Sequence, residues 1–257
     1  LPSNASATHI ADPPQTVHAN PDFTRVCAPS GLDGSPECIQ SALQAIDSAR
    51  AVEGVKVMVV PGGFSSLTVA QQLFVAVNLE RVDRGLPPFT GLTAGLNANA
   101  QRGADLANDP PDPGTDYDVV DTEWAGGSSN GLDALYGWMY DDGIGSGNLD
   151  CPKGGGVGCW GHRHGILDDF GTVGTLVMGA ALNRTSDTGD DKGGPSMAAS
   201  LAITSRPVTG YTYTWAQAMG ARAPVARFFA HGVPKTATWF AENVGAWPTT
   251  PTSRRPR

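Results

Sequence analysis

Glycine and proline interrupt this sequence throughout its length. Its 257 residues include 33 Gly and 20 Pro, together about a fifth of the chain, whereas an ordinary protein has roughly 12% of the two. Both residues destabilise the interior of helices. A mostly helical bundle is therefore excluded. Hydrophobic residues make up 40% of the chain, which is enough to bury the core of one large domain.

The charge balance excludes another class of protein. Lys and Arg number 17 against 25 Asp and Glu, a formal net charge of −8, and affinity for nucleic acid needs clustered basic residues. No apolar run approaches the roughly 20 residues of a membrane-spanning helix. We therefore expect no nucleic-acid partner, no membrane span, and a monomer whose ligands are neutral or cationic.

The four cysteines form two local pairs, Cys27 with Cys38 and Cys151 with Cys159. Four cysteines allow three pairings. Because none has Cys-x-x-Cys spacing, two disulfides are favoured over a zinc cage. A metal role for Cys159, three residues before His162, is the alternative. The sequence begins without an initiator Met or an apolar leader, as a secreted protein does after signal-peptide removal. We expect a secreted, extracellular protein.

The predicted elements are helices first and strands later. Capping residues and apolar periodicity predict helices over 36–54, 69–85, 92–107 and 130–140. Strand-like segments occupy 56–60, 172–182, 196–205 and 211–215. This order predicts an α+β fold, with helices packed on a small antiparallel sheet.

The other segments are predicted to be loops and termini. Residues 1–34 form an extended arm, and residues 248–257 form a disordered tail. Residues 108–123 are acidic and interrupted by prolines, which predicts an irregular loop. Residues 141–161 form a glycine-rich loop closed by the second cysteine pair, and 164–168 form a short turn.

Reactive side chains gather in three stretches: Glu123-Trp124, Trp138-Met-Tyr-Asp141-Asp142 and Gly161-His162-Arg163-His164. Asp141 lies three residues after Trp138 and close to the same helix face. Negative charge is unfavourable at the C-terminal end of a helix, so we expect an imidazole from His162 or His164 beside Asp141. With Glu123 as a second carboxylate, this cluster can move protons near neutral pH.

Four short motifs occur in an order known from one protein family. Asn78-Leu-Glu-Arg81 looks like an N-x-x-R on a first helix, and Glu123 is similar to the Glu of a Gly-Glu-Asn motif. Trp138-Met-Tyr-Asp141 looks like a W-x-x-E motif with Asp in place of Glu, and Cys159-Trp-Gly161-His162 looks like a Cys-Gly-His segment. Together these motifs resemble the CAP superfamily, or SCP domain (cysteine-rich secretory, antigen 5 and pathogenesis-related proteins), in its bacterial secreted form.

The resemblance covers residues 67–183 and implies a three-layer α-β-α sandwich. We expect one such domain over 35–247, with 67–183 as its core. A CAP cleft holds two His and two Glu. Matching each of them to this sequence by its motif gives Glu123, Asp141 and His162 as catalytic residues.

The second His of the family has no counterpart in residues 109–121. His164 can replace it only if the backbone there is extended, since residues i and i+2 then share a face. The two His of the family can bind a divalent metal. Zn²⁺ or Ca²⁺ at His162 and His164 is therefore compatible with the sequence, although no cofactor is required. For the acidic segments 108–123 and 187–194, solvated loops are favoured over calcium sites.

Two functions follow from these expectations. One is a hydrolase acting on extracellular glycan or cell-wall material, with Glu123 and Asp141 dividing the acid and base roles and His162 tuning them. The other is a non-catalytic module that binds a lipid, a sterol or a protein, in which the cluster only orders the loops. For that module, residues 223–247 either pack back on the domain or form a partner surface. The expected binding residues in the cleft are His164, Asp142, Trp124 and Trp138.

Overall fold

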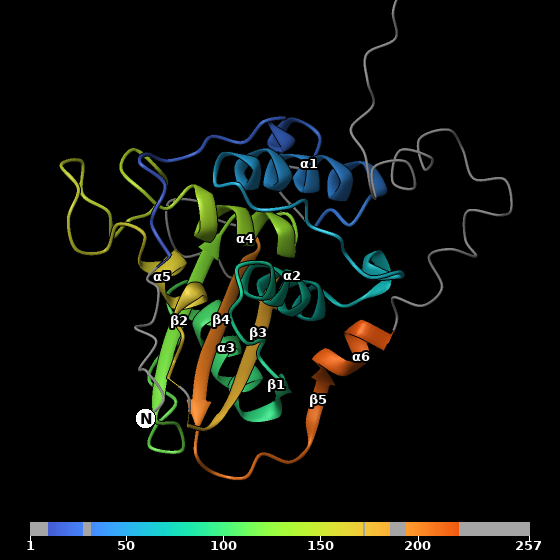
Figure 1. The fold of residues 1–257 in the computed structure, drawn as a ribbon, viewed down its shortest axis with the longest axis vertical. Helices are drawn as coiled ribbons and strands as arrows, with labels where there is room; N and C mark the ends of the chain where they lie inside the picture. The colour runs from blue at the N-terminus through green and yellow to red at the C-terminus, as the bar shows by residue number, and fades with distance from the viewer. Residues whose placement is uncertain (1–9, 28–31, 172, 186–193, 221–257) are drawn as a thin grey trace, which may run out of the picture.

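The structure is a computed structural model that describes residues 10–27, 32–171, 173–185 and 194–220 (Figure 1). The segment 223–247 and the tail 248–257 lie outside the described residues. The helices are α1 (Pro36–Val52), α2 (Val69–Asp83), α3 (Ala94–Leu106), α4 (Gly131–Tyr140), α5 (Gly161–Leu167) and α6 (Trp215–Gly220), with 3-10 turns η1 (Phe23–Arg25) and η2 (Phe64–Ser66). The strands are β1 (Gly91–Thr93), β2 (Val119–Gly126), β3 (Thr175–Asn183), β4 (Ser196–Thr204) and β5 (Tyr211–Thr214).

Side-chain caps fix the starts of three predicted helices. The Ser35 hydroxyl accepts a hydrogen bond from the Cys38 amide at the start of α1. Thr68 and Gln71 form a complete capping box at the start of α2. Asn130 accepts from two backbone amides of the first turn of α4. Because each cap acts within four residues, local sequence was sufficient to predict these helix starts.

The sheet has the strand order β2-β4-β3-β1-β5. Three of its pairs are antiparallel, but β1 runs parallel to β3. The α+β class is confirmed, whereas the prediction of a purely antiparallel sheet is wrong at β1. A parallel pair needs a long crossover, and the chain leaves β1 through α3 and β2 before it returns in β3.

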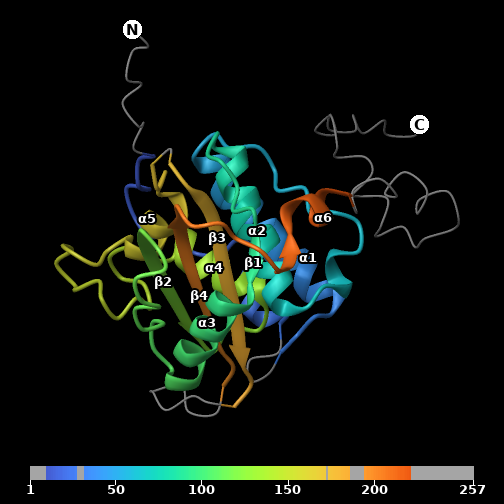
Figure 2. The same cartoon turned by 90° about the horizontal axis from the view of Figure 1, so that it is seen from below.

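Helices cover both faces of this sheet. The face toward α3 carries a small apolar cluster around Leu96, Val177 and Ala202. The neighbouring positions on the strands, such as Met178 and Leu201, belong to the larger core shared with α1, α2 and α4. Side chains alternate between the faces of a strand, so the two clusters lie on opposite sides of the sheet. The views in Figures 1 and 2 agree with this three-layer arrangement.

Three local predictions are wrong, each because contacts distant in sequence decide the backbone. Residues 56–60 form no strand, and the amide of Met58 instead donates to the Asp47 carboxylate at 2.7 Å. The predicted loop 108–123 ends in β2, which pairs with β4 along its whole length. The predicted turn 164–168 is largely helical, because α5 extends to Leu167.

The described part of the predicted arm lies against the helices. The Val17 amide donates to the Tyr140 carbonyl at 2.8 Å, and the Tyr136 hydroxyl donates to the Val17 carbonyl at 2.8 Å. Phe23 packs edge-on against Tyr136. The predicted disulfide between Cys27 and Cys38 is formed. This segment is therefore part of the packed structure.

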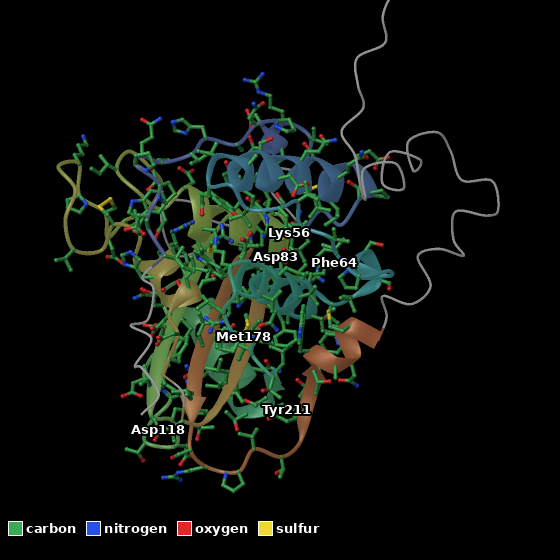
Figure 3. The ribbon with its side chains drawn as sticks, in the orientation of Figure 1. Lys56, Phe64, Asp83, Asp118, Met178 and Tyr211 are labelled. Atoms are coloured by element: carbon green, nitrogen blue, oxygen red, sulfur yellow. A yellow bond between two sulfur atoms is a disulfide. The ribbon has the colours of Figure 1, made fainter. Side chains whose placement is uncertain are left out.

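A buried network of ion pairs joins four helices. Arg50 on α1 binds Glu80 and Asp83 on α2, and Arg84 binds Glu80 and Glu53. Lys56 and Asp83 lie side by side at the edge of this network, 3.0 Å apart (Figure 3). The Tyr140 hydroxyl on α4 donates to Glu80, and Arg163 on α5 forms a bidentate pair with Glu53. These pairs fix α5 relative to the other helices.

Asn78 and Arg81 hold neighbouring loops in place. The Asn78 amide bonds to both backbone groups of Phe89. The Arg81 guanidinium donates to the carbonyls of Ile166 and Asp168 at 2.6 and 2.7 Å, at the C-terminal end of α5. It also lies over the Phe89 ring. The N-x-x-R motif therefore orders the segment that follows α5.

Substitution of Gly179 is expected to break the contact between β3 and α3. A Cβ at this position would collide with the backbone of Leu96, and overpacking of this kind costs about 1–3 kcal/mol. Gly137→Ala on α4 is the control, because nothing lies within 4 Å of its added Cβ and Ala in a helix gains about 0.5–1 kcal/mol over Gly. Urea unfolding should show Gly179→Ala destabilised and Gly137→Ala stabilised. Equal stabilities would contradict this packing.

Candidate functional site

The carboxylate of Asp142 caps the first turn of α5. Its Oδ2 accepts hydrogen bonds from the backbone amides of His162 at 3.1 Å and Arg163 at 3.5 Å. The residue before the helix, Trp160, provides no side-chain cap. The first amides of a helix need such acceptors. Asp142 provides them from twenty residues away in sequence, which explains why α5 forms in a glycine-rich segment.

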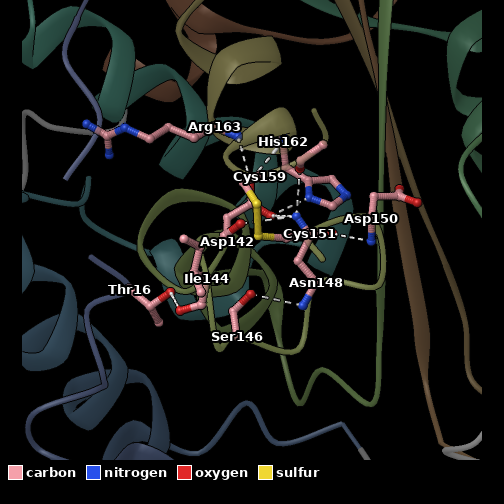
Figure 4. The surroundings of a disulfide bond; sticks show 11 residues. Thr16, Asp142, Ile144, Ser146, Asn148, Asp150, Cys151, Cys159, His162 and Arg163 are labelled. Atoms are coloured by element: carbon pink, nitrogen blue, oxygen red, sulfur yellow. Dashed lines mark hydrogen bonds and ion pairs between the residues drawn. A yellow bond between two sulfur atoms is a disulfide. The ribbon is translucent and has the colours of Figure 1, made fainter. Parts of the chain in front are cut away.

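The same carboxylate holds the ring of His162. Nδ1 of His162 lies 2.7 Å from Oδ1 of Asp142 (Figure 4). Burial by itself lowers the pKa of His162, but the hydrogen bond and negative charge of Asp142, with the charge of Asp109, raise it. Burial raises the pKa of Asp142, and the hydrogen bond from His162 opposes that rise. The imidazole therefore keeps its proton to higher pH than a free histidine.

This pair lies in the wall of a cavity of about 550 Å³. Trp124 on β2 and Trp138 on α4 form part of the same wall. Among the described residues that line the cavity, one is His, none is Lys or Arg, and five are acids: Asp109, Asp133, Asp141, Asp142 and Asp150. The cavity is therefore negatively charged, which disfavours anionic ligands.

Asp109 and Asp141 line this cavity, and one carboxylate oxygen of each, Oδ1, is buried without a hydrogen-bond partner among the described residues. Burial raises the pKa of Asp109, with the positive charge of His162 opposing the rise. Burial likewise raises the pKa of Asp141, where His18 is the opposing charge. Asp141 thus does not form the predicted pair with an imidazole of α5. Asp142 forms that pair with His162.

Glu123 lies beneath α5, away from the cavity lining. Its side chain comes from β2 and is 1% exposed, and a Cβ at Gly165 would collide with its Oε1. Its Oε2 has no hydrogen-bond partner in the described part of the chain. Burial, followed by the charges of Asp109 and Asp121, raises the pKa of Glu123 well above its ordinary value of 4.5. Glu123 is therefore a buried acid with a raised pKa.

The two tryptophans contribute differently to the site. Trp138 is buried, donates through Nε1 to the Trp124 carbonyl at 2.9 Å, and stacks on His162 with ring centroids 6.4 Å apart. The Trp138 ring therefore packs against a face of the imidazole. Trp124 is half-buried and donates to the Ser196 hydroxyl at 2.6 Å. Both side chains line the cavity, and Trp124 has the larger exposed surface.

His164 does not lie beside His162. Because α5 is helical there, its ring lies outside the cavity lining and bonds to Asp12 at 2.9 Å. The predicted disulfide between Cys151 and Cys159 is formed, so Cys159 has no thiolate for a metal. Within the described ranges, the only group of three potential ligands close enough for one ion is Cys27, Asp33 and Cys38. Since those cysteines are bonded to each other, the described residues do not form a ready metal centre.

Sequence reasoning missed three residues of the site: Asp109, Asn148 and Asp150. Asp109 follows α3, in the segment where the CAP resemblance places a second His. Its position in that segment is the signal that could have identified it as a site residue. Asn148 and Asp150 lie in the glycine-rich loop, which carries no motif. Only the disulfide and the fold of that loop bring them to the cavity.

Comparison with known proteins adds one similarity. No protein-family model matches the chain, and no curated protein matches it. Among solved structures, it is similar to an extracellular protein containing an SCP domain from Bacillus anthracis. The sequence identity is 16% and the TM-score is 0.34, over 66% of this chain and 44% of that one. The CAP resemblance therefore rests on the motifs. None of the described helices is long and apolar enough to cross a membrane.

Replacing Glu123 with Gln is expected to stabilise the protein by an amount that grows with pH. The raised pKa of Glu123 means that the folded state keeps a proton that the unfolded chain releases as the pH passes the ordinary value. Wild-type stability therefore falls as the pH rises from the ordinary pKa of Glu toward the pKa of Glu123 in the folded protein. Gln does not titrate, so the variant does not lose stability in this way. Urea unfolding at about pH 5 and about pH 8 measures the effect.

The matched control is Glu37→Gln, which removes an exposed acid from α1. Its effect on the free energy of unfolding should be small and nearly constant between the two pH values. A constant difference between wild type and the Glu123 variant would show that Glu123 is ionised in the folded protein.

Proposed function

We propose that this chain is a secreted CAP-like protein that hydrolyses neutral or cationic glycan of the extracellular or cell-wall type. The observation that carries the proposal is the Asp142–His162 pair in the wall of an acidic cavity of about 550 Å³. Cavities of this size hold a small molecule or a short stretch of a polymer. A carboxylate-oriented imidazole is a common general acid or base.

His162 is the proposed general acid. With Nδ1 bound to Asp142, Nε2 is the nitrogen that can exchange a proton with a ligand. The raised pKa of His162 keeps the imidazole protonated toward neutral pH, which suits donation to a leaving oxygen. Asp142 orients the ring and stabilises its positive charge.

Asp109 is the proposed general base. Its charge acts on His162, and the residue lines the cavity. In the reaction, a water molecule transfers a proton to Asp109, and the oxygen of that water bonds to the anomeric carbon. The glycosidic C–O bond breaks in the same step, as His162 protonates the leaving oxygen. Asp141 provides a further acceptor for ligand hydroxyl or amino groups.

A specific observation supports the second candidate, a non-catalytic binding module. Glu123, the acid that the family resemblance makes catalytic, lies beneath α5 and is 1% exposed. Asp142 also serves as a helix cap. The burial of Glu123 keeps it from a ligand in the cavity, and the capping role of Asp142 needs no catalysis. In this module the same cavity holds a neutral or cationic ligand without cleaving it.

We expect the hydrolysis to depend on His162 and not on His164. His162→Asn removes the proposed general acid, which contributes typically 10²–10⁴-fold. His164→Asn is the matched control on the same helix, since its ring bonds to Asp12 outside the cavity. Release of reducing ends from peptidoglycan and a polysaccharide panel measures the activity. Equal activity in the two variants would contradict the role given to His162, and no activity in the wild type would favour the binding module.

We also propose that neither folding nor the reaction requires a metal, since the described cavity residues form no close ligand group. Treatment with EDTA should leave the melting temperature and any hydrolysis unchanged. Release of stoichiometric zinc or calcium, with a fall in melting temperature, would overturn this expectation.

A further inference from the structure

The side chain of Asn148 connects the glycine-rich loop to the Asp142–His162 pair. Its Nδ2 donates to Oδ1 of Asp142 at 2.7 Å and lies 3.1 Å from the Asp142 carbonyl and 3.0 Å from the Gly158 carbonyl. Its Oδ1 accepts from the Asp150 amide at 2.8 Å. Figure 4 shows Asn148, Asp142 and His162 directed toward one another. The amide nitrogen thus bonds to both the pair and the loop, and the amide oxygen bonds to the loop.

Among the described residues, Asn148 is the donor to the Asp142 carboxylate that lies outside α5. The other donors to this carboxylate are the ring and backbone of His162 and the backbone of Arg163, all in the first turn of α5. Asn148 binds from the opposite segment and on the same oxygen as the ring of His162. It therefore adds a second donor to the oxygen that binds the ring of His162.

The Cys151–Cys159 disulfide closes the loop around this contact. Cys159 follows Gly158, whose carbonyl bonds to Asn148, and the Cys151 amide donates to the Asn148 carbonyl at 3.3 Å. Gly158 has a φ of +99°, and a Cβ there would collide with the Asp150 carbonyl. The disulfide and this close packing keep both sides of the loop within reach of Asn148.

We propose that Asn148 is a positioning residue for the Asp142–His162 pair, and that the Cys151–Cys159 disulfide holds Asn148 in place. The assignment of an acid–base role to the pair rests on the proposed function. The positioning of the His162 ring does not rest on the proposed function. The glycine-rich loop is therefore part of the site and carries a residue that fixes its geometry.

The downfield proton resonance of His162 Nδ1–H tests this geometry without any substrate. A histidine proton that is hydrogen-bonded to a carboxylate and shielded from water gives such a resonance, and His162→Asn assigns it by its loss. We expect the resonance in the wild type, and its loss or upfield shift in Asn148→Ala. Near-UV circular dichroism establishes that each variant is folded.

Two further variants separate the donor from the loop. Asn148→Asp keeps an oxygen for the Asp150 amide but removes the donor to Asp142, so it should lose the resonance as well. Ser146→Ala is the control, because the Ser146 hydroxyl accepts from the Asn148 backbone amide at 3.1 Å and is not among the donors to Asp142; it should keep the resonance. An unchanged resonance in both Asn148 variants overturns the proposal.

The double variant Cys151→Ser/Cys159→Ser tests the disulfide. It should lose the resonance as Asn148→Ala does, and retention would overturn the role given to the disulfide. If the wild type hydrolyses glycan, Asn148→Ala should lower kcat by on the order of 10-fold with KM unchanged. An equal loss in Ser146→Ala would contradict positioning. If the wild type hydrolyses nothing, the proposed function fails, and the resonance still decides the role of Asn148.

Discussion

The site depends on one buried carboxylate, that of Asp142. It caps α5, fixes the ring of His162 and receives the amide of Asn148. A buried carboxylate is costly unless its oxygens are satisfied, and here the donors come from both the helix and the loop. The fold of α5, the orientation of the imidazole and the order of the glycine-rich loop are therefore consequences of the same set of hydrogen bonds.

A second set of polar contacts holds α5 from its other side. Arg163, the residue after His162, forms a bidentate pair with Glu53 and donates to the Met139 carbonyl at 2.9 Å. Glu53 is shared with Arg84, which continues the network to α2. Breaking a buried pair of this kind leaves an uncompensated charge and costs about 3–5 kcal/mol. The position of His162 thus depends on the same interactions that join the helices.

The sequence predicted those elements whose causes lie within a few residues. Thr68 with Gln71, and Asn130, marked helix starts because their caps are local. The short separations of the cysteines predicted both disulfides. It did not predict β2, because its acidic residues resemble a loop until β4 pairs with them. Nor did it predict that Asp142, and not Asp141, binds His162, since that choice depends on where α5 packs.

The sequence by itself determined an acidic α+β domain with two local disulfides and a cluster of carboxylates near His162. Composition, capping and spacing are sufficient for this because they act over short distances. Only the tertiary structure placed Glu123 beneath α5, turned His164 toward Asp12, and brought Asp109 and Asn148 to the cavity. These outcomes depend on helix packing and strand pairing between distant segments, and the burial they create sets the pKa shifts of the site.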